Sequence, residues 1–369
     1  MAESVLMKGN EALAEAAIRA GCRYYFGYPI TPQNEISEYM ARRLGEEGGV
    51  FVQAESEVAA INMVYGAAGA GGRVLISSSS PGISLMQEGI SYIAGSELPC
   101  VLINMARGGP GLGGIQPSQS DYFQATKGGG HGDYRLVVYG PATIQEACDL
   151  MAHAFEVADE YRNPVMILGD GMIGQMMEPV SFPDRPEKPR LPEKPWATTG
   201  NAGRKSNLVS SILLDPEQLD AHNWQIQAKY TEIEKTEKKA LVLYGDDSEW
   251  FFVAYGTVAR ICQSVVNRLR KEGVKVGLVR PVSLWPFPDY AFDQVVDRAK
   301  GFLCVEMSTG QMVEDVKLAV AGRKIVRFYG RTGGAVPHPR DVERRLRDMI
   351  AGKVPSVTDY WDKVGGVRA

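Results

Sequence analysis

The feature of this sequence that most limits its fold is the regular alternation of strand-like and helix-like segments. Residues 51–82 show it most clearly: a short apolar run ends at Glu55 and Glu57, a helical run of small residues covers about 58–70, and a second apolar run ends in a cluster of serines. Such alternation is typical of parallel strands joined by helices that cover both faces of a sheet. We therefore predict an α/β fold.

The alternation extends along most of the chain, and one segment of different composition interrupts it. Between residues 179 and 195 the sequence holds six prolines, and a polar stretch continues to residue 239. We predict a first α/β domain over 1–178, a proline-rich and polar arm over 179–239, and a smaller α/β domain over 240–369. The strands of the second domain are expected at 250–255, 274–278, 301–306 and 324–329.

Composition excludes several classes of function. The net charge of −4 argues against nucleic acid as a partner. The five cysteines are widely spaced and form no CxxC pair, so we expect no metal site or iron–sulfur cluster held by this chain alone. We also predict no membrane span and no signal peptide, because no long apolar run occurs. These features favour a cytoplasmic location with reduced thiols.

Three loops follow predicted strands and carry residues suited to ligand binding. They are Gly27–Pro32, Ser80–Gly82 and Met105–Pro110. Open α/β sheets bind their ligands at the carboxyl ends of the strands, so we expect these loops to lie at one edge of the first sheet.

Each candidate residue in this region also has a structural interpretation. Glu57 could be a solvated residue at a helix start, where the helix dipole favours a carboxylate. Thr31, held between two prolines, could point its hydroxyl at a ligand or could cap the helix expected at 33–44.

The arginine loop leaves alternatives open as well. Arg107 could bind a carboxylate through two parallel hydrogen bonds, or it could be a surface residue paired with Asp121 or Glu97. His131, in the glycine-rich segment 127–133, could be a ligand-binding residue or a local hydrogen-bonding residue.

Taken together, the motifs GYPITP, QAESEVAAINMVYGAAGAG, SSSSPGISLMQEG and ARGGPG resemble the alpha subunit of the 2-oxoacid:ferredoxin oxidoreductases. The resemblance covers essentially the whole chain. It is greatest to the branched-chain type that acts on 2-oxoisovalerate, because MKGNEA, IQPSQSDYFQATKGGGHGDY and LGDGMIGQMMEPV also fit that type.

The resemblance implies a pyrimidine-type domain of a thiamine diphosphate enzyme, followed by a transketolase C-terminal-like domain. It implies oxidative decarboxylation of a 2-oxoacid with coenzyme A as co-substrate and ferredoxin as electron acceptor. A beta subunit would bind the diphosphate and Mg²⁺, and a gamma subunit would bind coenzyme A. A ferredoxin-like subunit would carry the [4Fe-4S] clusters.

The resemblance also assigns roles to individual residues. Glu57, rather than Glu55, falls on the glutamate that hydrogen-bonds N1′ of the cofactor's aminopyrimidine. Thr31 would lie near the reacting carbonyl, and Arg107 would hold the substrate carboxylate, with His131 in the same pocket. The remaining residues expected to bind the cofactor are Pro29, Ile30, Ser80 and Gly82.

Two further points belong to this hypothesis. Gly169-Asp170-Gly171 with Asn201 partly matches the metal and diphosphate motif of thiamine diphosphate enzymes, but the proline-rich arm stands between the two parts, so we assign no metal to this chain. The alternatives are the same chemistry on 2-oxoglutarate or pyruvate, and a noncatalytic assembly subunit.

Overall fold

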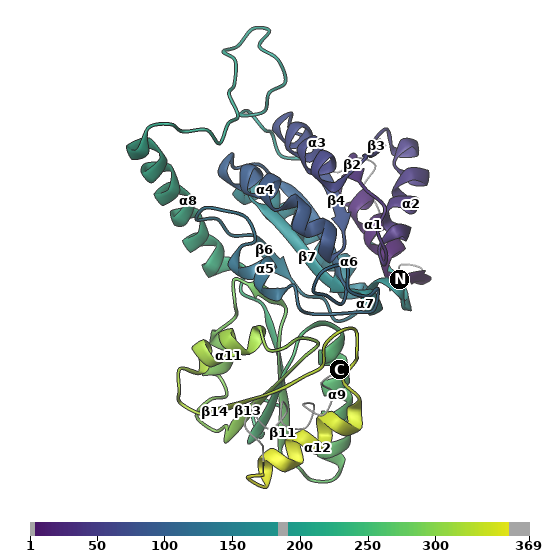
Figure 1. Ribbon diagram of the computed structural model, residues 1–369, viewed down its shortest axis with the longest axis vertical. Helices are drawn as coiled ribbons and strands as arrows, with labels where there is room; N and C mark the ends of the chain where they lie inside the picture. Colours follow the sequence, from purple (N-terminus) through teal and green to yellow (C-terminus); the bar gives the residue numbers. More distant parts are fainter. Residues whose placement is uncertain (1–3, 184–190, 354–369) are drawn as a thin grey trace.

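The computed structural model describes residues 4–183 and 191–353, which form two layered α/β domains stacked along the long axis of the molecule (Figure 1). The first domain holds a seven-stranded sheet with strand order β12-β6-β7-β5-β4-β2-β3. The second holds a five-stranded sheet with strand order β14-β13-β10-β11-β9. The predicted α/β class is confirmed.

The first sheet is parallel except at one edge. The strand β12 pairs antiparallel with β6, although it comes from the second half of the chain. Every residue of β5 and β7 is buried, as expected for central strands covered by helices on both faces. The strands are β2 (Tyr24–Gly27), β3 (Val50–Gln53), β4 (Val74–Ser78), β5 (Cys100–Ala106), β6 (Val137–Tyr139), β7 (Pro164–Asp170) and β12 (Ser283–Trp285).

Helices cover both faces of this sheet because side chains alternate along each strand. In β5, Cys100 and Leu102 pack into one apolar cluster, whereas Val101 and Ile103 pack into the other. The first cluster is completed by α3 (Glu57–Gly69), α4 (Ser80–Gly95) and α5 (Tyr122–Lys127). The second is completed by α1 (Gly9–Arg19), α2 (Asn34–Arg43) and α6 (Ile144–Tyr161).

The second domain contains the four expected parallel strands and one that was not expected. The additional strand is β9, which pairs antiparallel with β11. The strands are β9 (Ala240–Leu243), β10 (Trp250–Val253), β11 (Val276–Pro281), β13 (Gly301–Glu306) and β14 (Ile325–Gly330). The helices are α9 (Gly256–Lys271), α10 (Tyr290–Asp293), α11 (Met312–Val320) and α12 (Pro339–Ile350).

The connecting arm is tied to the first domain at several points. Its first strand, β8 (Met177–Ser181), pairs with β1 (Ser4–Lys8). Its helix α8 (Pro216–Thr236) lies within the stretch predicted to be polar. It packs on the first domain through Tyr230, whose hydroxyl accepts a hydrogen bond from Arg135 N at 2.9 Å. Within the described residues, no helix is long and apolar enough to cross a membrane.

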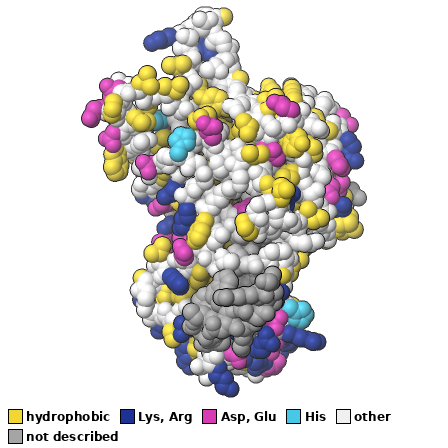
Figure 2. All heavy atoms as spheres, in the orientation of Figure 1, with side chains coloured by type: hydrophobic (Ala, Val, Ile, Leu, Met, Phe, Trp, Pro, Cys, Tyr) yellow, Lys and Arg dark blue, Asp and Glu magenta, His cyan; other side chains and the backbone are white. Residues whose placement is uncertain are grey.

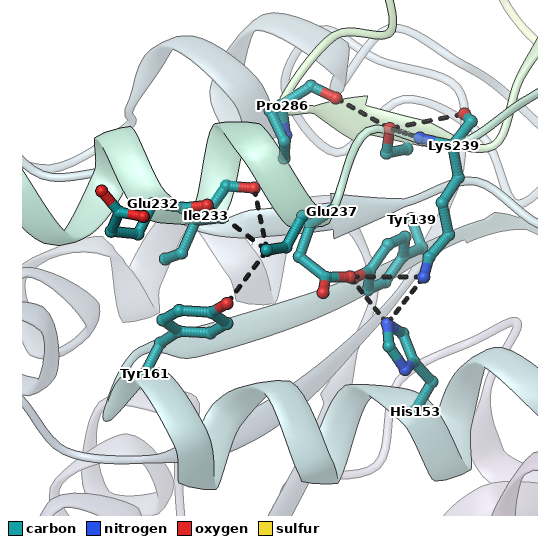
Figure 3. A network of polar contacts seen from close by, with 10 residues as sticks. Tyr139, His153, Tyr161, Glu232, Ile233, Glu237, Lys239 and Pro286 are labelled. Atoms are coloured by element: carbon teal, nitrogen blue, oxygen red, sulfur yellow. Dashed lines mark hydrogen bonds and ion pairs between the residues drawn. The ribbon is translucent and has the colours of Figure 1, made fainter.

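Polar contacts fix the junction between the two domains. Arg280 donates two hydrogen bonds of 2.7 Å to the carboxylate of Glu146 on α6. Where α8 ends, Glu237 accepts hydrogen bonds from Tyr139 and contacts His153 (Figure 3). These contacts cross from the first domain to the arm and the second domain, so the two sheets have a defined relative position.

Carboxyl ends of strands from the two sheets face each other across this junction. Gln119, in the segment after β5, donates from its backbone N to Met307 O at 2.9 Å and accepts from Met307 N at 3.0 Å through Oε1. Its Nε2 donates to Tyr255 O, just after β10, at 2.9 Å. The second domain therefore covers the part of the first sheet's strand-end edge that lies near β5.

Candidate functional site

Glu57 is the first residue of α3, which begins after a three-residue connection from β3. Ser56 caps this helix, because its hydroxyl accepts the N–H of Ala59 at 3.2 Å. Glu57 is 6% exposed. No hydrogen bond or ion pair reaches its carboxylate from residues 4–183 or 191–353. A buried carboxylate normally has partners, so this one has an unused capacity to accept a hydrogen bond.

Gly82, in the first turn of α4, allows this carboxylate to lie where it does. A Cβ atom at position 82 would be 2.8 Å from Glu57 Cγ, and closer still to Glu57 Oε1 and Ser78 Oγ. Only a residue without a side chain permits this approach. The structure therefore brings together two of the predicted residues, Glu57 and Gly82, from neighbouring helices.

Arg107, directly after β5, is buried and has no carboxylate partner among the residues that the structure describes. Its Nη1 donates to Thr31 O at 2.9 Å, and its Nη2 donates to Leu112 O at 3.2 Å. Its Nε is buried without a hydrogen-bond partner. Asp121 and Glu97, the residues of the alternative interpretation, bind other groups. The guanidinium is thus held in place by carbonyl groups, and it has donors, Nε–H among them, that no described residue accepts.

Thr31 is exposed and precedes a cis peptide bond to Pro32. Its carbonyl accepts the hydrogen bond from Arg107, whereas its hydroxyl has no partner among the described residues. Gln33, not Thr31, occupies the cap position of α2. The helix-cap interpretation of Thr31 is therefore not observed. Pro29 is exposed and Ile30 is half-buried in the same loop.

Thr31 also lines a cleft of about 560 Å³ between the two domains. The first domain contributes loop residues Ile115 and Met172, and the second domain contributes Val336. Glu35 provides the only charged side chain among the described lining residues. The cleft is large enough for a small organic acid.

Ser80 is the first residue of α4 and is engaged in contacts within the chain. Its hydroxyl lies 2.6 Å from Asp121 Oδ2 and accepts a hydrogen bond from Arg107 N at 3.0 Å. Asn104 Nδ2 donates to the same Asp121 oxygen at 2.8 Å. Sequence reasoning missed Asn104, and it considered Asp121 only as a possible partner of Arg107 rather than of Ser80. The available signal was a polar residue inside the otherwise apolar strand β5.

His131 lies away from the residues described above. It is exposed, and its ring meets Tyr92 edge-on with a centroid distance of 6.3 Å. Tyr92 is twelve residues along α4 from Ser80, which corresponds to about 18 Å along the helix axis. The chain by itself does not bring His131 next to Thr31 or Arg107, and its role in substrate binding stays a prediction.

Asp170, the acid of the partial metal motif, has a structural role. Its Oδ1 accepts the N–H groups of Met172 and Ile173 at 2.9 and 3.2 Å, at the start of the short helix α7 (Gly171–Gln175). It also accepts the hydroxyl of Thr257 in the second domain at 3.0 Å. Burial raises the pKa of Asp170, although these hydrogen bonds oppose the rise. Within the described ranges, no cluster of three His, Cys, Asp or Glu side chains could hold a metal ion.

Comparison with known proteins identifies the family. The model of the thiamine diphosphate-binding domain of pyruvate flavodoxin/ferredoxin oxidoreductases matches residues 15–243. The model of core domain II of pyruvate:ferredoxin oxidoreductase matches residues 248–342. The two models together cover both structural domains, and the first contains Glu57, Gly82 and Arg107.

Individual relatives support the same family assignment. The ketoisovalerate oxidoreductase subunit VorB of Methanothermobacter marburgensis is 49% identical over 94% of this chain and 98% of its own length. The 2-oxoglutarate synthase subunit KorA of Methanothermobacter thermautotrophicus is 35% identical over 95% of this chain and all of its own length.

A solved structure with the same fold is 2-oxoglutarate:ferredoxin oxidoreductase from Magnetococcus marinus, with 2-oxoglutarate, coenzyme A and succinyl-CoA bound. It superimposes with a TM-score of 0.86 at 25% identity and covers 95% of this chain and 66% of that chain. The chain therefore belongs to the 2-oxoacid:ferredoxin oxidoreductase family and is of the alpha type.

Proposed function

We propose that this chain, with thiamine diphosphate, forms the pyrimidine-binding half of the active site in a branched-chain 2-oxoacid:ferredoxin oxidoreductase. The reaction converts 2-oxoisovalerate and coenzyme A to an acyl-CoA and CO₂, and two electrons pass singly to ferredoxin. One observation carries this proposal: Glu57 presents a buried carboxylate that no described residue binds, within the region that matches the thiamine diphosphate-binding family model.

The residues present fit the pyrimidine end of this cofactor. An aminopyrimidine ring nitrogen needs a carboxyl group with which to share a proton, and the Glu57 carboxylate has that capacity unused. Gly82 keeps the space beside the carboxylate free of a side chain. When bound, thiamine diphosphate supplies a nucleophilic carbon and an electron sink. The part of Glu57 is to hold a proton at the ring nitrogen.

Arg107 and Thr31 would bind and orient the substrate. A 2-oxoacid presents a carboxylate, and the Arg107 guanidinium keeps its Nε–H and further Nη–H donors for such a group. The carbonyls of Thr31 and Leu112 hold the guanidinium in one orientation, so little freedom is lost when substrate binds. Pro29, Ile30 and Ser80 shape the same edge, and His131 is proposed to reach the substrate in the assembled enzyme.

The remaining cofactors would lie on partner subunits. A beta subunit would bind the diphosphate and Mg²⁺, a gamma subunit coenzyme A, and a ferredoxin-like subunit the [4Fe-4S] clusters. All five cysteines of this chain are buried, and burial raises the pKa of Cys22 to about 12, which disfavours the thiolate that a cluster ligand requires. Val58 on α3 and Leu85 on α4 are exposed apolar side chains suited to a subunit interface. Figure 2 shows that apolar side chains are spread over the visible face of the first domain.

Two observations favour a branched-chain substrate. Identity to the ketoisovalerate subunit is 49%, against 35% to the 2-oxoglutarate subunit. Apart from Arg107, which lies outside the described lining, the cleft beside Thr31 presents the charged side chain of Glu35 and no lysine or arginine that could bind a second carboxylate. A second carboxylate, as in 2-oxoglutarate, would require a cation there. Pyruvate and 2-oxoglutarate remain the alternative substrates.

The experiment is to reconstitute the complex with its native partners and to compare kcat/KM for 2-oxoisovalerate, 2-oxoglutarate and pyruvate. We expect 2-oxoisovalerate to be preferred by about ten-fold or more, a difference that one or two methyl contacts can supply. A preference for 2-oxoglutarate would overturn the substrate assignment. Undiminished turnover after both Glu57→Gln and Arg107→Ala would favour a noncatalytic assembly subunit instead.

A further inference from the structure

We infer that Asp121 is a positioning residue for substrate binding, because it fixes Arg107 through the hydroxyl of Ser80. This inference rests on the proposed role of Arg107 as the residue that binds the substrate carboxylate. Asp121 itself touches neither the Arg107 guanidinium nor the cleft, according to the contacts within the described residues.

Two hydrogen bonds connect Asp121 to Arg107 through the hydroxyl of Ser80. The Ser80 hydroxyl has a single proton, and the Asp121 oxygen at 2.6 Å is a better acceptor than the Arg107 carbonyl at 3.3 Å. When that proton points to Asp121, a lone pair of the Ser80 oxygen is left to accept the N–H of Arg107 at 3.0 Å. Asp121 therefore determines how the hydroxyl is oriented, and the hydroxyl determines where the backbone of Arg107 lies.

Asn104 reinforces this arrangement from β5. Its Nδ2 donates to Asp121 Oδ2 at 2.8 Å, while its Oδ1 is buried without a partner. No lysine, arginine or histidine pairs with Asp121 among the described residues. A shielded acid without a cation partner costs stability, so its presence points to a role other than stabilising the fold. The purpose that the geometry supports is to orient two neutral donors beside Arg107.

Asp121 also connects Arg107 to the second domain. The two residues stand at opposite ends of the glycine-rich loop 108–120. The far end of that loop is held by the second domain, since Gln311 Nε2 donates to Ser120 O at 2.7 Å and Gln119 pairs with Met307. Through Asp121 and Ser80, this fixed far end sets the position of the near end, where Arg107 begins the loop.

The test uses the reconstituted complex and the substrate that it turns over best. Asp121→Ala leaves the Ser80 hydroxyl without its acceptor, so we expect KM for the 2-oxoacid to rise about ten-fold, with kcat within about three-fold of wild type. Asp121→Asn keeps a carbonyl oxygen in place of Oδ2, the oxygen that receives both hydrogen bonds. We therefore expect this variant to restore KM to within about three-fold.

Two controls separate positioning from a general loss of structure. Asp133→Ala removes an exposed acid from the glycine-rich segment 127–133 and is expected to leave KM and kcat unchanged. In a double-mutant cycle, Asp121→Ala added to Arg107→Ala should raise KM by less than about two-fold further, because the residue through which Asp121 acts is already absent.

The outcomes are distinguishable. A rise in KM for Arg107→Ala but none for Asp121→Ala would overturn the positioning role and leave the proposed function intact. Equal effects of Asp121→Ala in both backgrounds would overturn it as well, because the effect would then not pass through Arg107. An unchanged KM for Arg107→Ala would instead contradict the proposed function. If the Asp121→Ala chain does not assemble into the complex, Asp121→Asn alone decides. A large rise in its KM would count against the positioning role of Asp121.

Discussion

Two buried glutamates, one near the strand ends of each sheet, differ in what binds them. Glu306, the last residue of β13, accepts the hydroxyl of Ser308 at 2.9 Å and the N–H groups of Met312 and Val313 at 3.0 Å each. Glu57, at the start of α3, accepts no hydrogen bond from the described residues. Both are almost fully buried. Glu306 therefore caps the helix α11, and the lack of described partners for Glu57 is what our proposal that it binds the cofactor requires.

The strand-end edges around Glu306 and Glu57 also differ in how far they are covered. The edge that carries Glu306 is covered by the first domain, because Met307 is bound by Gln119. On the other sheet, Thr31 and Pro29 remain exposed near the strand ends. The edge of the second sheet thus has a structural role, and the exposed part of the first sheet's edge is where our proposal places the cofactor and a second subunit.

The largest expected effect is a difference in kcat between variants of Glu57 and Glu306. Glu57→Gln should lower kcat of the reconstituted complex by about a hundred-fold or more, because an amide cannot hold a proton at the cofactor's ring nitrogen. Glu306→Gln should leave kcat within about three-fold of wild type. Steady-state turnover of both variants with saturating thiamine diphosphate checks this pair, and equal losses in kcat would remove the distinction.

A third carboxylate, Glu237, can be compared with Glu57 and Glu306. Its partners include ionisable groups, so its effect on stability depends on pH. Figure 3 shows the contacts of Glu237 with His153, Tyr139 and Lys239. Burial of the Glu237 carboxylate acts to raise its pKa, but the hydrogen bonds with His153 and Tyr139 and the positive charge of Lys239 outweigh this effect and lower the pKa to about 2. Its ordinary pKa is 4.5. The stabilisation is therefore complete above pH 4.5 and is lost as the pH falls toward 2.

For Glu237→Gln we expect a loss on the order of 2 kcal/mol in the free energy of unfolding at pH 7, after allowance for solvent screening. The difference from wild type should narrow as the pH falls below 4.5. Urea unfolding of both proteins at pH values between 7 and 3.5 measures it. A difference that stays constant or widens over this range would contradict the assigned pKa direction.

Glu306→Gln should reduce stability where Glu57→Gln does not. The glutamine amide would place an N–H₂ group against the backbone donors of α11, which would cost about 1–3 kcal/mol. Glu57→Gln leaves no donor without an acceptor, so its melting temperature should stay close to that of wild type. Thermal unfolding of the isolated chain compares them, and the reverse ranking would show that the roles are exchanged.

The smallest effect concerns the space beside Glu57. Gly82→Ala places a methyl group against Glu57 and Ser78, so the carboxylate must shift, and we expect kcat to fall about ten-fold. Gly66→Ala is the matched control, because a Cβ atom at that position of α3 has no neighbour within 4 Å. It should leave kcat unchanged and slightly stabilise the helix. Equal kcat values for the two variants would count against the close packing of Glu57.

Much of the fold could be predicted from the sequence, because buried parallel strands appear as apolar runs between helical repeats. The strand β12 could not, because Ser283–Trp285 is short and pairs with β6, a strand distant in the sequence. The pairing of β1 with β8 was missed for the same reason. Local patterns carry no information about partners that meet only after the chain has folded.

The candidate site shows the same limit. The loops that hold Glu57 and Arg107 could be located by their place after predicted strands. No described residue binds the Glu57 carboxylate, and Asp121 binds Ser80 rather than Arg107. Both facts depend on side-chain positions, which the spacing of residues along the sequence does not determine. His131 lies in a loop whose path the sequence did not define, and the chain alone places it beside Tyr92.

The most direct test of the central claim is a structure of the native complex with thiamine diphosphate bound. We predict that the Glu57 carboxylate lies within about 2.6–3.2 Å of the aminopyrimidine ring nitrogen N1′, with the diphosphate held by another subunit. A map that places the ring elsewhere, with Glu57 facing solvent or a structural partner, would contradict the account.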